Sequence, residues 1–204
     1  MVELVFTGKR GHYDCNTRYK YFMSKIINKY LTFNQTTYTY INTGIEKLLF
    51  EHEKILGVHI RGTDFRKKYN RHPVFITAQD CFKYIDQLFE KNKYNKIFLA
   101  TDDMNILKEF VTKYEDNVIY YSDVIRSDDM RSVAFYENNR DKNNYKLGLE
   151  VIRDMYTLSC CDGLVAGISQ VAICAQINKL ARKEFYEDIM IINKGIYKNH
   201  HYFT

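Results

Sequence analysis

The sequence predicts an α/β fold in which a doubly wound, mainly parallel sheet carries helices on both faces. Short apolar runs alternate along the chain with segments whose apolar residues recur at helical spacing. The runs at 97–100, 163–166 and 189–192 are continuous, which is typical of parallel strands buried on both faces, and Leu56, Val58 and Ile60 mark a further buried strand at 56–60. With 204 residues and 46% hydrophobic content, the chain can bury such a core without disulfides or metals.

Residues 1–54 precede this regular pattern. Residues 2–6 have strand character, and residues 17–30 carry apolar side chains at helical spacing. A Thr/Tyr alternation follows at 36–41, and residues 45–50 resemble the end of a second helix. We therefore expect two units, a mostly helical extension over 1–54 and an α/β domain over 55–204. The extension is interpreted as a lid, an edge element or a homo-oligomer contact.

The remaining elements follow in order after the strand at 56–60. A helix is predicted over about 78–91, with Thr77 as its N-cap and Asp80 three residues later. The strand at 97–100 leads to a helix over 105–114 and a strand over 118–121. Residues 123–144 are charged and irregular, as surface loops are. Helices over 146–161 and 169–182 flank the strand at 163–166, and 189–192 closes the sheet.

Composition excludes several classes of function. The five cysteines have no metal-ligand spacing, and their odd number argues against a disulfide framework, so a reducing, cytoplasmic location is expected. No leader peptide and no apolar run near ~18 residues is present, so no transmembrane segment is expected. The formal charge is +5, but basic and acidic residues are interspersed along the sequence, and no nucleic-acid-binding signature is present. The basic cluster at 66–71 has two interpretations, a solvated loop or an electrostatic collar for an anionic ligand.

The segment at 56–65 carries the most informative polar residues. His59, Arg61 and Asp64 come at or just past the end of a buried strand, and Gly62 allows a tight turn between them. Ligands of open α/β sheets bind beyond the carboxyl ends of the strands. An arginine there offers a planar fork of donors suited to a phosphate or a carboxylate. The alternative is a surface loop in which Arg61 and Asp64 simply pair.

Two other strand ends are also polar. Asp102 and Asp103 follow the strand at 97–100; one is expected to be a helix N-cap, and the other to orient Arg61 or accept from a ligand hydroxyl. Ser169 and Gln170 open the helix after the strand at 163–166, where backbone N–H groups attract anions, although Ser169 is equally well explained as an N-cap. No P-loop and no G-x-G-x-x-G segment is present, which disfavours a Walker-type NTPase and a dinucleotide dehydrogenase.

Asp154 lies on the apolar stripe of its predicted helix, together with Leu147, Val151 and Leu158. Aspartate is rarely buried without a partner. It either pairs inside the protein or accepts from a ligand, and the N1–H and 2-amino group of guanine are a fitting pair of donors. His59 is a candidate for the same ligand, but a histidine in a strand is more often a satisfied core residue.

With these residues assembled, the chain resembles the GDP-fucose-dependent fucosyltransferase superfamily, and most closely the α-1,6-fucosyltransferases. Four segments carry the resemblance, in the same order as in the family. They are a His-x-Arg-x-x-Asp motif at 59–64, Ala-Thr-Asp-Asp at 100–103, a helix running through Asp154 to Asp162, and Ser-Gln-Val at 169–171.

The resemblance implies the Rossmann-like, nucleotide-binding half of a GT-B-type glycosyltransferase. Arg61 would bind the β-phosphate of GDP with help from Ser169 and Gln170, while His59 and Asp154 would read guanine. Fucose would pass with inversion to a hydroxyl of a glycan acceptor, without a cofactor or an obligatory metal. Electrostatic stabilisation of the departing GDP by Arg61 agrees with this reaction.

The chain departs from the family pattern at three places. Gly62 stands where the core-glycan enzymes have a second arginine, and Phe65 stands where they have a lysine. Residues 66–71 contain no carboxylate to match the family's next acidic residue. Asp64 is therefore the local candidate for the catalytic base, followed by Asp102 and Asp103. The alternatives to a fucosyltransferase are a transferase for another nucleotide sugar and an inactive GDP-sugar-binding or interaction module.

Overall fold

The computed structural model describes residues 14–49, 54–91, 93–129, 131–135 and 140–198. Its sheet has five parallel strands in the order β3-β2-β1-β4-β5. The strands are β1 (Ile55–Ile60), β2 (Lys96–Thr101), β3 (Val118–Ile119), β4 (Gly163–Gly167) and β5 (Asp188–Ile192). The helices are α1 (Asp14–Tyr30), α2 (Gln35–Leu49), α3 (Ala78–Glu90), α4 (Met104–Tyr114), α5 (Asn143–Cys160) and α6 (Gln170–Ala181), with 3₁₀ turns η1 (Thr63–Lys67), η2 (Glu115–Asn117) and η3 (Val133–Phe135). The predicted α/β class and parallel sheet are confirmed.

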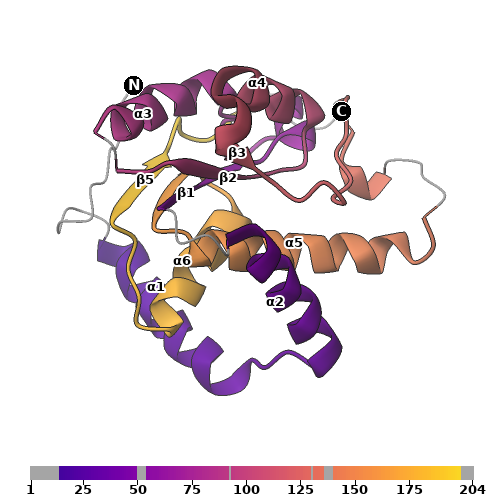
Figure 1. Ribbon diagram of the computed structural model, residues 1–204, viewed down its shortest axis with the longest axis vertical. Coiled ribbons are helices and arrows are strands. Elements are labelled where there is room, and N and C mark those ends of the chain that lie inside the picture. Colours follow the sequence, from indigo (N-terminus) through magenta and orange to yellow (C-terminus); the bar gives the residue numbers. More distant parts are fainter. Residues whose placement is uncertain (1–13, 50–53, 92, 130, 136–139, 199–204) are drawn as a thin grey trace.

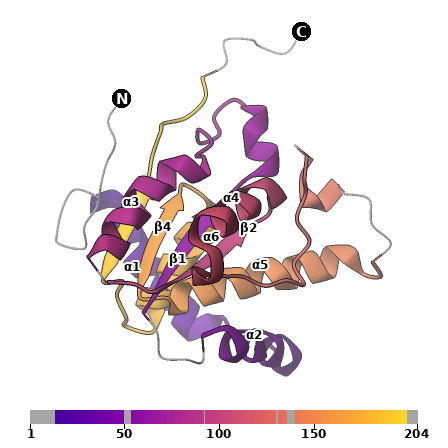
Figure 2. The same ribbon diagram turned by 45° about the horizontal axis from the view of Figure 1, so that its top comes forward.

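Helices α3 and α4 cover one face of the sheet and α5 and α6 cover the other, as Figures 1 and 2 show, and an apolar cluster lies on each side of the sheet. Successive side chains of a strand point to opposite faces. Leu56, Val58 and Ile60 of β1 therefore pack in the layer under α3 and α4. The alternate positions, Gly57 and His59, face α5. Every residue of β1 is buried, including the polar His59.

The boundaries of the predicted elements follow local signals. Thr77 and Asp80 form the expected capping box of α3, because each side chain accepts a hydrogen bond from the other residue's backbone N–H. The predicted strand at 118–121 is wrong in length, since β3 ends at Ile119. Tyr121 instead turns toward α5, where its hydroxyl lies 2.7 Å from Thr157 Oγ1. This contact with α5 takes the place of strand pairing for Tyr121, which follows the edge strand β3.

The N-terminal helices form a third layer beyond α5 and α6 (Figure 1). The Thr/Tyr alternation at 36–41 lies inside the single helix α2, where Ile41 is buried and Asn34 Oδ1 accepts from the Thr37 N–H. Lys20 of α1 donates to Gln176 of α6 over 2.7 Å. The predicted strand character of residues 2–6 lies outside the described residues.

The strand order places β1 at the centre of the sheet. The chain winds outward from β1 through β2 to β3, and then returns to the other side of β1 to form β4 and β5. The gap between the carboxyl ends of β1 and β4 is therefore the topological switch point, where open α/β sheets bind their ligands. The residues that follow Ile60 and Gly167 therefore lie where the fold predicts a ligand-binding site.

Two glycines offer a matched test of this packing. A Cβ on Gly163 would meet the Tyr94 ring and the Leu56 side chain at less than 3 Å, whereas a Cβ on the exposed Gly148 of α5 would meet nothing within 4 Å. Gly163→Ala should lower the free energy of unfolding by about 1–3 kcal/mol. Gly148→Ala should raise it by about 0.5–1 kcal/mol, because alanine favours a helix interior. Urea unfolding followed by circular dichroism measures both, and equal effects of the two changes would contradict this account of β4.

Candidate functional site

Arg61, just past the end of β1, is held in place by Asp102 at the end of β2. The guanidinium nitrogen Nη1 of Arg61 lies 2.8 Å from Asp102 Oδ2. The same carboxylate accepts from the Gly62 N–H and from the Thr63 hydroxyl, each over 2.8 Å. Thr63 is buried and its φ is 35°, an unfavourable value for a β-branched residue. Asp102 therefore fixes the turn after β1 as well as the direction of Arg61, as the sequence predicts for one of the two aspartates.

The neighbouring Asp103 is the predicted N-cap. Its Oδ1 accepts from the backbone N–H groups of Asn105 and Ile106 at the start of α4. Its Oδ2 accepts two hydrogen bonds from Arg66, at 2.9 and 3.0 Å, and the side chain is 1% exposed. Both oxygens of Asp103 thus make structural contacts, one with the start of α4 and one with Arg66.

Gly62 is required by this close approach. A Cβ at position 62 would collide with the side chain of Asp103. Packing against Asp103 therefore explains the glycine at this position. Arg66 lies over the ring of Phe75, 4.5 Å from its centroid, and one member of the basic cluster at 66–71 is thus part of the turn.

A pocket opens between the ends of β1 and β2, helix α5 and the segment after β3. The space between these walls is about 460 Å³ when the part that is open to solvent is included. Polar walls come from His59, Arg61 and Asp102 on the sheet, and from Glu150 and Asp154 on α5. The apolar walls are Val124, Ile125, Val133, Leu147, Val151 and Val171, with Thr101 beside them. Val151, expected on a buried stripe, is 45% exposed.

His59 presents an unused acceptor to this pocket. Its Nδ1 lies 3.0 Å from the Ala100 carbonyl, which only accepts, so Nδ1 carries the proton. Nε2 is buried and has no hydrogen-bond partner. Burial lowers the pKa of His59 to about 4, so the ring is neutral near pH 7. Nε2 therefore offers one lone pair to a ligand donor.

Asp154 is the second acceptor. Burial raises its pKa to about 7, opposed by the charges of Arg126 and Arg153. Within the described part of the chain, its carboxylate makes no hydrogen bond. The sequence left two interpretations open, internal pairing and a ligand contact. The charges of Arg126 and Arg153 agree with the first, and a carboxylate without a hydrogen bond in the described structure agrees with the second.

Glu150, one helical turn before Asp154, was missed by the sequence analysis. It is buried, and its Oε1 pairs with Arg140 over 2.6 Å while its Oε2 has no partner. Arg126, also missed, is buried in the segment after β3, and its Nε and Nη2 have no hydrogen-bond partner. The i, i+4 spacing of Glu150 and Asp154 was the one available signal, because residues at that spacing share a helix face.

A smaller pocket lies on the other side of Arg61, at the switch point. Its walls include Phe65, Gly167 and Ser169. Ser169 is the N-cap of α6, and its Oγ accepts from the Ala172 N–H over 3.1 Å. Gln170 is exposed and belongs to the walls of neither pocket. Arg61 therefore separates a pocket with unused acceptors from one beside a helix N-terminus, where anions are favoured.

Asp64, the local candidate for the catalytic base, lies in η1, and its side chain is outside what the structure describes. Among the described residues, no three or more His, Cys, Asp or Glu side chains are grouped so that they could hold a metal ion. None of the helices in the described ranges is long and apolar enough to cross a membrane.

Comparison with solved structures finds similar chains. The structure of NodZ alpha-1,6-fucosyltransferase soaked with GDP-fucose is 17% identical, with a TM-score of 0.48, over 75% of this chain and 45% of that one. The structure of POFUT1 in complex with GDP-fucose is 13% identical, with a TM-score of 0.44, over 81% of this chain and 48% of that one. This chain therefore spans less than half the length of these solved relatives.

A family model described as alpha-(1,6)-fucosyltransferase N- and catalytic domains matches residues 14–182. The match includes the turn after β1, the cap of α4, the Asp154 helix and the start of α6. The chain belongs to this alpha-(1,6)-fucosyltransferase family.

Proposed function

We propose that the chain binds GDP-fucose across Arg61 and transfers its fucose to a hydroxyl of a glycan. The observation that carries the proposal is that Arg61 forms a wall of both pockets. The guanine base would occupy the pocket of His59 and Asp154, and the diphosphate would reach over Arg61 to the N-terminus of α6. Family membership supports the choice of donor.

The unused acceptors favour guanine over other bases. His59 Nε2 can only accept, because the proton of the neutral ring is on Nδ1. Ionised Asp154 also only accepts. Guanine presents the N1–H and the 2-amino group as adjacent donors, whereas adenine has an acceptor at N1. A purine with donors at that edge is therefore the complementary ligand.

The other side of Arg61 suits the leaving group. Its guanidinium and the N–H groups at the start of α6 would stabilise the negative charge that grows on the β-phosphate as its bond to C1 of fucose breaks. Ser169 would add its hydroxyl, and we retain Gln170 as a phosphate ligand on the family motif alone. Asp102, by holding Arg61, acts as a positioning residue.

The transfer itself needs a base. The acceptor oxygen would attack C1 with inversion, GDP would depart, and the proton of the acceptor hydroxyl would pass to a carboxylate. Asp102 and Asp103 are both engaged in the turn and the cap, which leaves Asp64 as our candidate. We propose no metal and no additional cofactor for this step.

One observation favours a second candidate, a GDP-sugar-binding module without transferase activity. Residues 66–71 contain no carboxylate to match the family's next acidic residue. Donor binding and fucosyl transfer must therefore be measured separately.

Arg61 should dominate nucleotide affinity. In calorimetric titrations, GDP and GDP-fucose should bind while UDP and ADP bind weakly or not at all. Arg61→Ala should weaken GDP binding roughly tenfold to a hundredfold, as expected for hydrogen bonds to a charged group. Arg61→Lys should restore only part of the loss, because the planar fork is missing. Lys67→Ala, which removes an exposed charge from the same turn, is the control and should change little. Absence of binding by all four nucleotides would overturn the assignment.

Asp154 should make both guanine binding and stability depend on pH. Its pKa is raised from 3.8 to about 7 in the folded chain. Ionised Asp154 is the form that accepts from guanine, so GDP affinity relative to ADP should rise as the pH passes through about 7. Asp154→Asn should abolish this rise.

The raised pKa also means that folding takes up a proton between about pH 4 and 7, so stability falls as the pH rises through this window. Asp154→Asn should consequently be more stable than the parent at pH 8, by roughly 2 kcal/mol. Equal unfolding midpoints of the two proteins at pH 8 would contradict a buried, ionised Asp154.

Asp64 should be needed for transfer but not for donor binding. Asp64→Asn should bind GDP with little change, while release of GDP from GDP-fucose in the presence of glycan acceptors falls roughly 10²- to 10⁴-fold. Undiminished turnover would remove Asp64 from the mechanism. Tight donor binding by the parent protein without any turnover would favour the binding module.

A further inference from the structure

The stretch between Cys15 and Ile45, which covers most of α1 and part of α2, has a composition unlike the rest of the chain. Between Cys15 and Ile45 the sequence contains no Asp or Glu, although the protein has 25 such residues. Arg18, Lys25 and Lys29 lie in this stretch and are exposed. Among the described residues, none of the three pairs with a carboxylate. Arg18, Lys25 and Lys29 therefore form a group of exposed positive charges in a stretch without carboxylates.

Aromatic residues share this face. Arg18, Tyr21, Phe22, Lys25 and Lys29 follow the spacing i, i+3, i+4, i+7 and i+11, which puts them on one side of a helix. We call these five residues the outer face of α1. Tyr21 is 57% exposed and Phe22 is 62% exposed, while Ser24 on the opposite side is buried.

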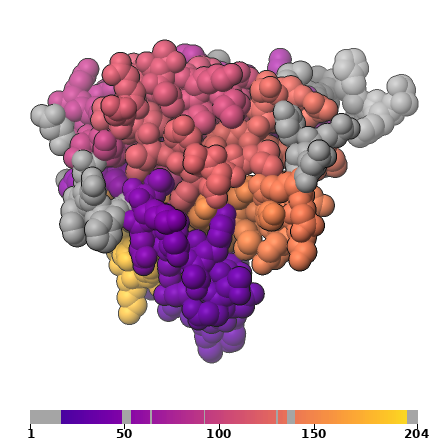
Figure 3. Space-filling model, turned by 45° about the vertical axis from the view of Figure 1, so that its right-hand side comes forward, coloured from indigo at the N-terminus to yellow at the C-terminus, as the bar shows by residue number. Residues whose placement is uncertain are grey.

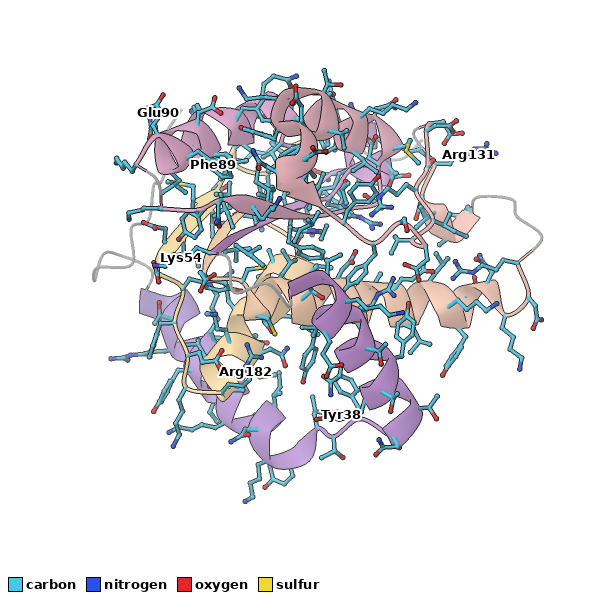
Figure 4. The ribbon with its side chains drawn as sticks, viewed as in Figure 1. Tyr38, Lys54, Phe89, Glu90, Arg131 and Arg182 are labelled. Atoms are coloured by element: carbon cyan, nitrogen blue, oxygen red, sulfur yellow. The ribbon has the colours of Figure 1, made fainter. Side chains whose placement is uncertain are left out.

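The end of α1 extends this surface. Tyr30 and Leu31 are each 66% exposed, and Tyr38 of α2 is 54% exposed. Figure 4 labels Tyr38 low on α2, away from the sheet, and Figure 3 shows the N-terminal helices (indigo) below α5 (orange) as the lower part of the molecule. The apolar groups thus continue beyond the outer face of α1 at an extremity of the described structure.

The cations lie over the rings. Lys25 Nζ is 4.6 Å from the centroid of the Tyr21 ring, and Lys29 Nζ is 5.0 Å from that of Tyr30. Apolar stems with charged ends, interleaved with tyrosine and phenylalanine, are the side chains found at the boundary between lipid headgroups and acyl chains. An amphipathic helix with such a face lies in the plane of an anionic membrane.

We propose that the outer face of α1, with Tyr30 and Leu31, docks the protein on an anionic lipid surface. Charge complementarity favours this occupant over a second copy of the chain. A two-fold contact through this face would bring Arg18, Lys25 and Lys29 against the same three cations, with no carboxylate in the stretch to separate them. Headgroup phosphates neutralise the cations, while Phe22 and Leu31 enter the apolar boundary.

Changes at Lys25 and Lys29 test whether positive charge contributes to lipid binding. The whole chain is mixed with vesicles of phosphatidylcholine alone, or of phosphatidylcholine with phosphatidylglycerol, and bound protein is measured by flotation. Binding is expected only with the anionic lipid and should weaken as salt is added. The double change Lys25→Gln, Lys29→Gln should reduce the partition coefficient by about fivefold per lysine. The charge-matched control Lys91→Gln, Lys108→Gln, at exposed positions on the other side of the sheet, should leave it unchanged.

The apolar part is tested by Phe22→Ser with Leu31→Ser, which keeps every charge. Lower partition to anionic vesicles at low salt supports insertion, whereas unchanged partition overturns it. All these positions are exposed, so thermal melting should confirm that each variant folds. Failure of the parent protein to float with anionic vesicles at low salt overturns the proposal. A dimer in light scattering that the lysine changes abolish also overturns it, and would assign the face to a second copy.

Discussion

The ion pair between Arg61 and Asp102 joins the two central strands at the point where a ligand would meet the sheet. Asp102 also accepts from Gly62 and Thr63, so one carboxylate determines both the turn and the direction of the guanidinium. Three hydrogen-bonded partners offset the cost of removing this carboxylate from water. The two pockets on either side of Arg61 depend on that arrangement, since each uses the arginine as a wall.

Polar groups in the larger pocket are held in an unfavourable state. Asp154 has a raised pKa, His59 keeps a buried lone pair without a partner, and Glu150 leaves one oxygen unused. Each such group costs stability in the absence of a ligand. Under the proposed function, a ligand that supplies donors would recover this cost, and this would be the physical basis for selectivity among bases. Binding and stability would then be opposed at the same side chains.

The N-terminal helices contact the rest of the protein through one side, and the outer side of α1 is exposed. Tyr40 of α2 and Tyr121 after β3 enclose the Arg153 guanidinium, at 4.6 and 3.8 Å, and Asp123 pairs with it. These contacts attach the layer to α5 through its inner side. The outer side of α1 then keeps its cations and rings for an external partner, which is why we treat it as a docking surface and not as part of the nucleotide site.

The sequence by itself determined the α/β class, the positions of the five strands of the sheet, the capping box at Thr77 and the polar residues that follow the strands at 56–60, 97–100 and 163–166. These features depend on neighbours a few positions apart, so periodicity and capping rules reach them. Only the tertiary structure decided that Asp103 is the cap while Asp102 holds Arg61, that β3 stops at Ile119, and that Glu150 and Arg126 lie beside the pocket. Those outcomes depend on which strands become neighbours, and the order β3-β2-β1-β4-β5 brings together residues that are far apart in the chain.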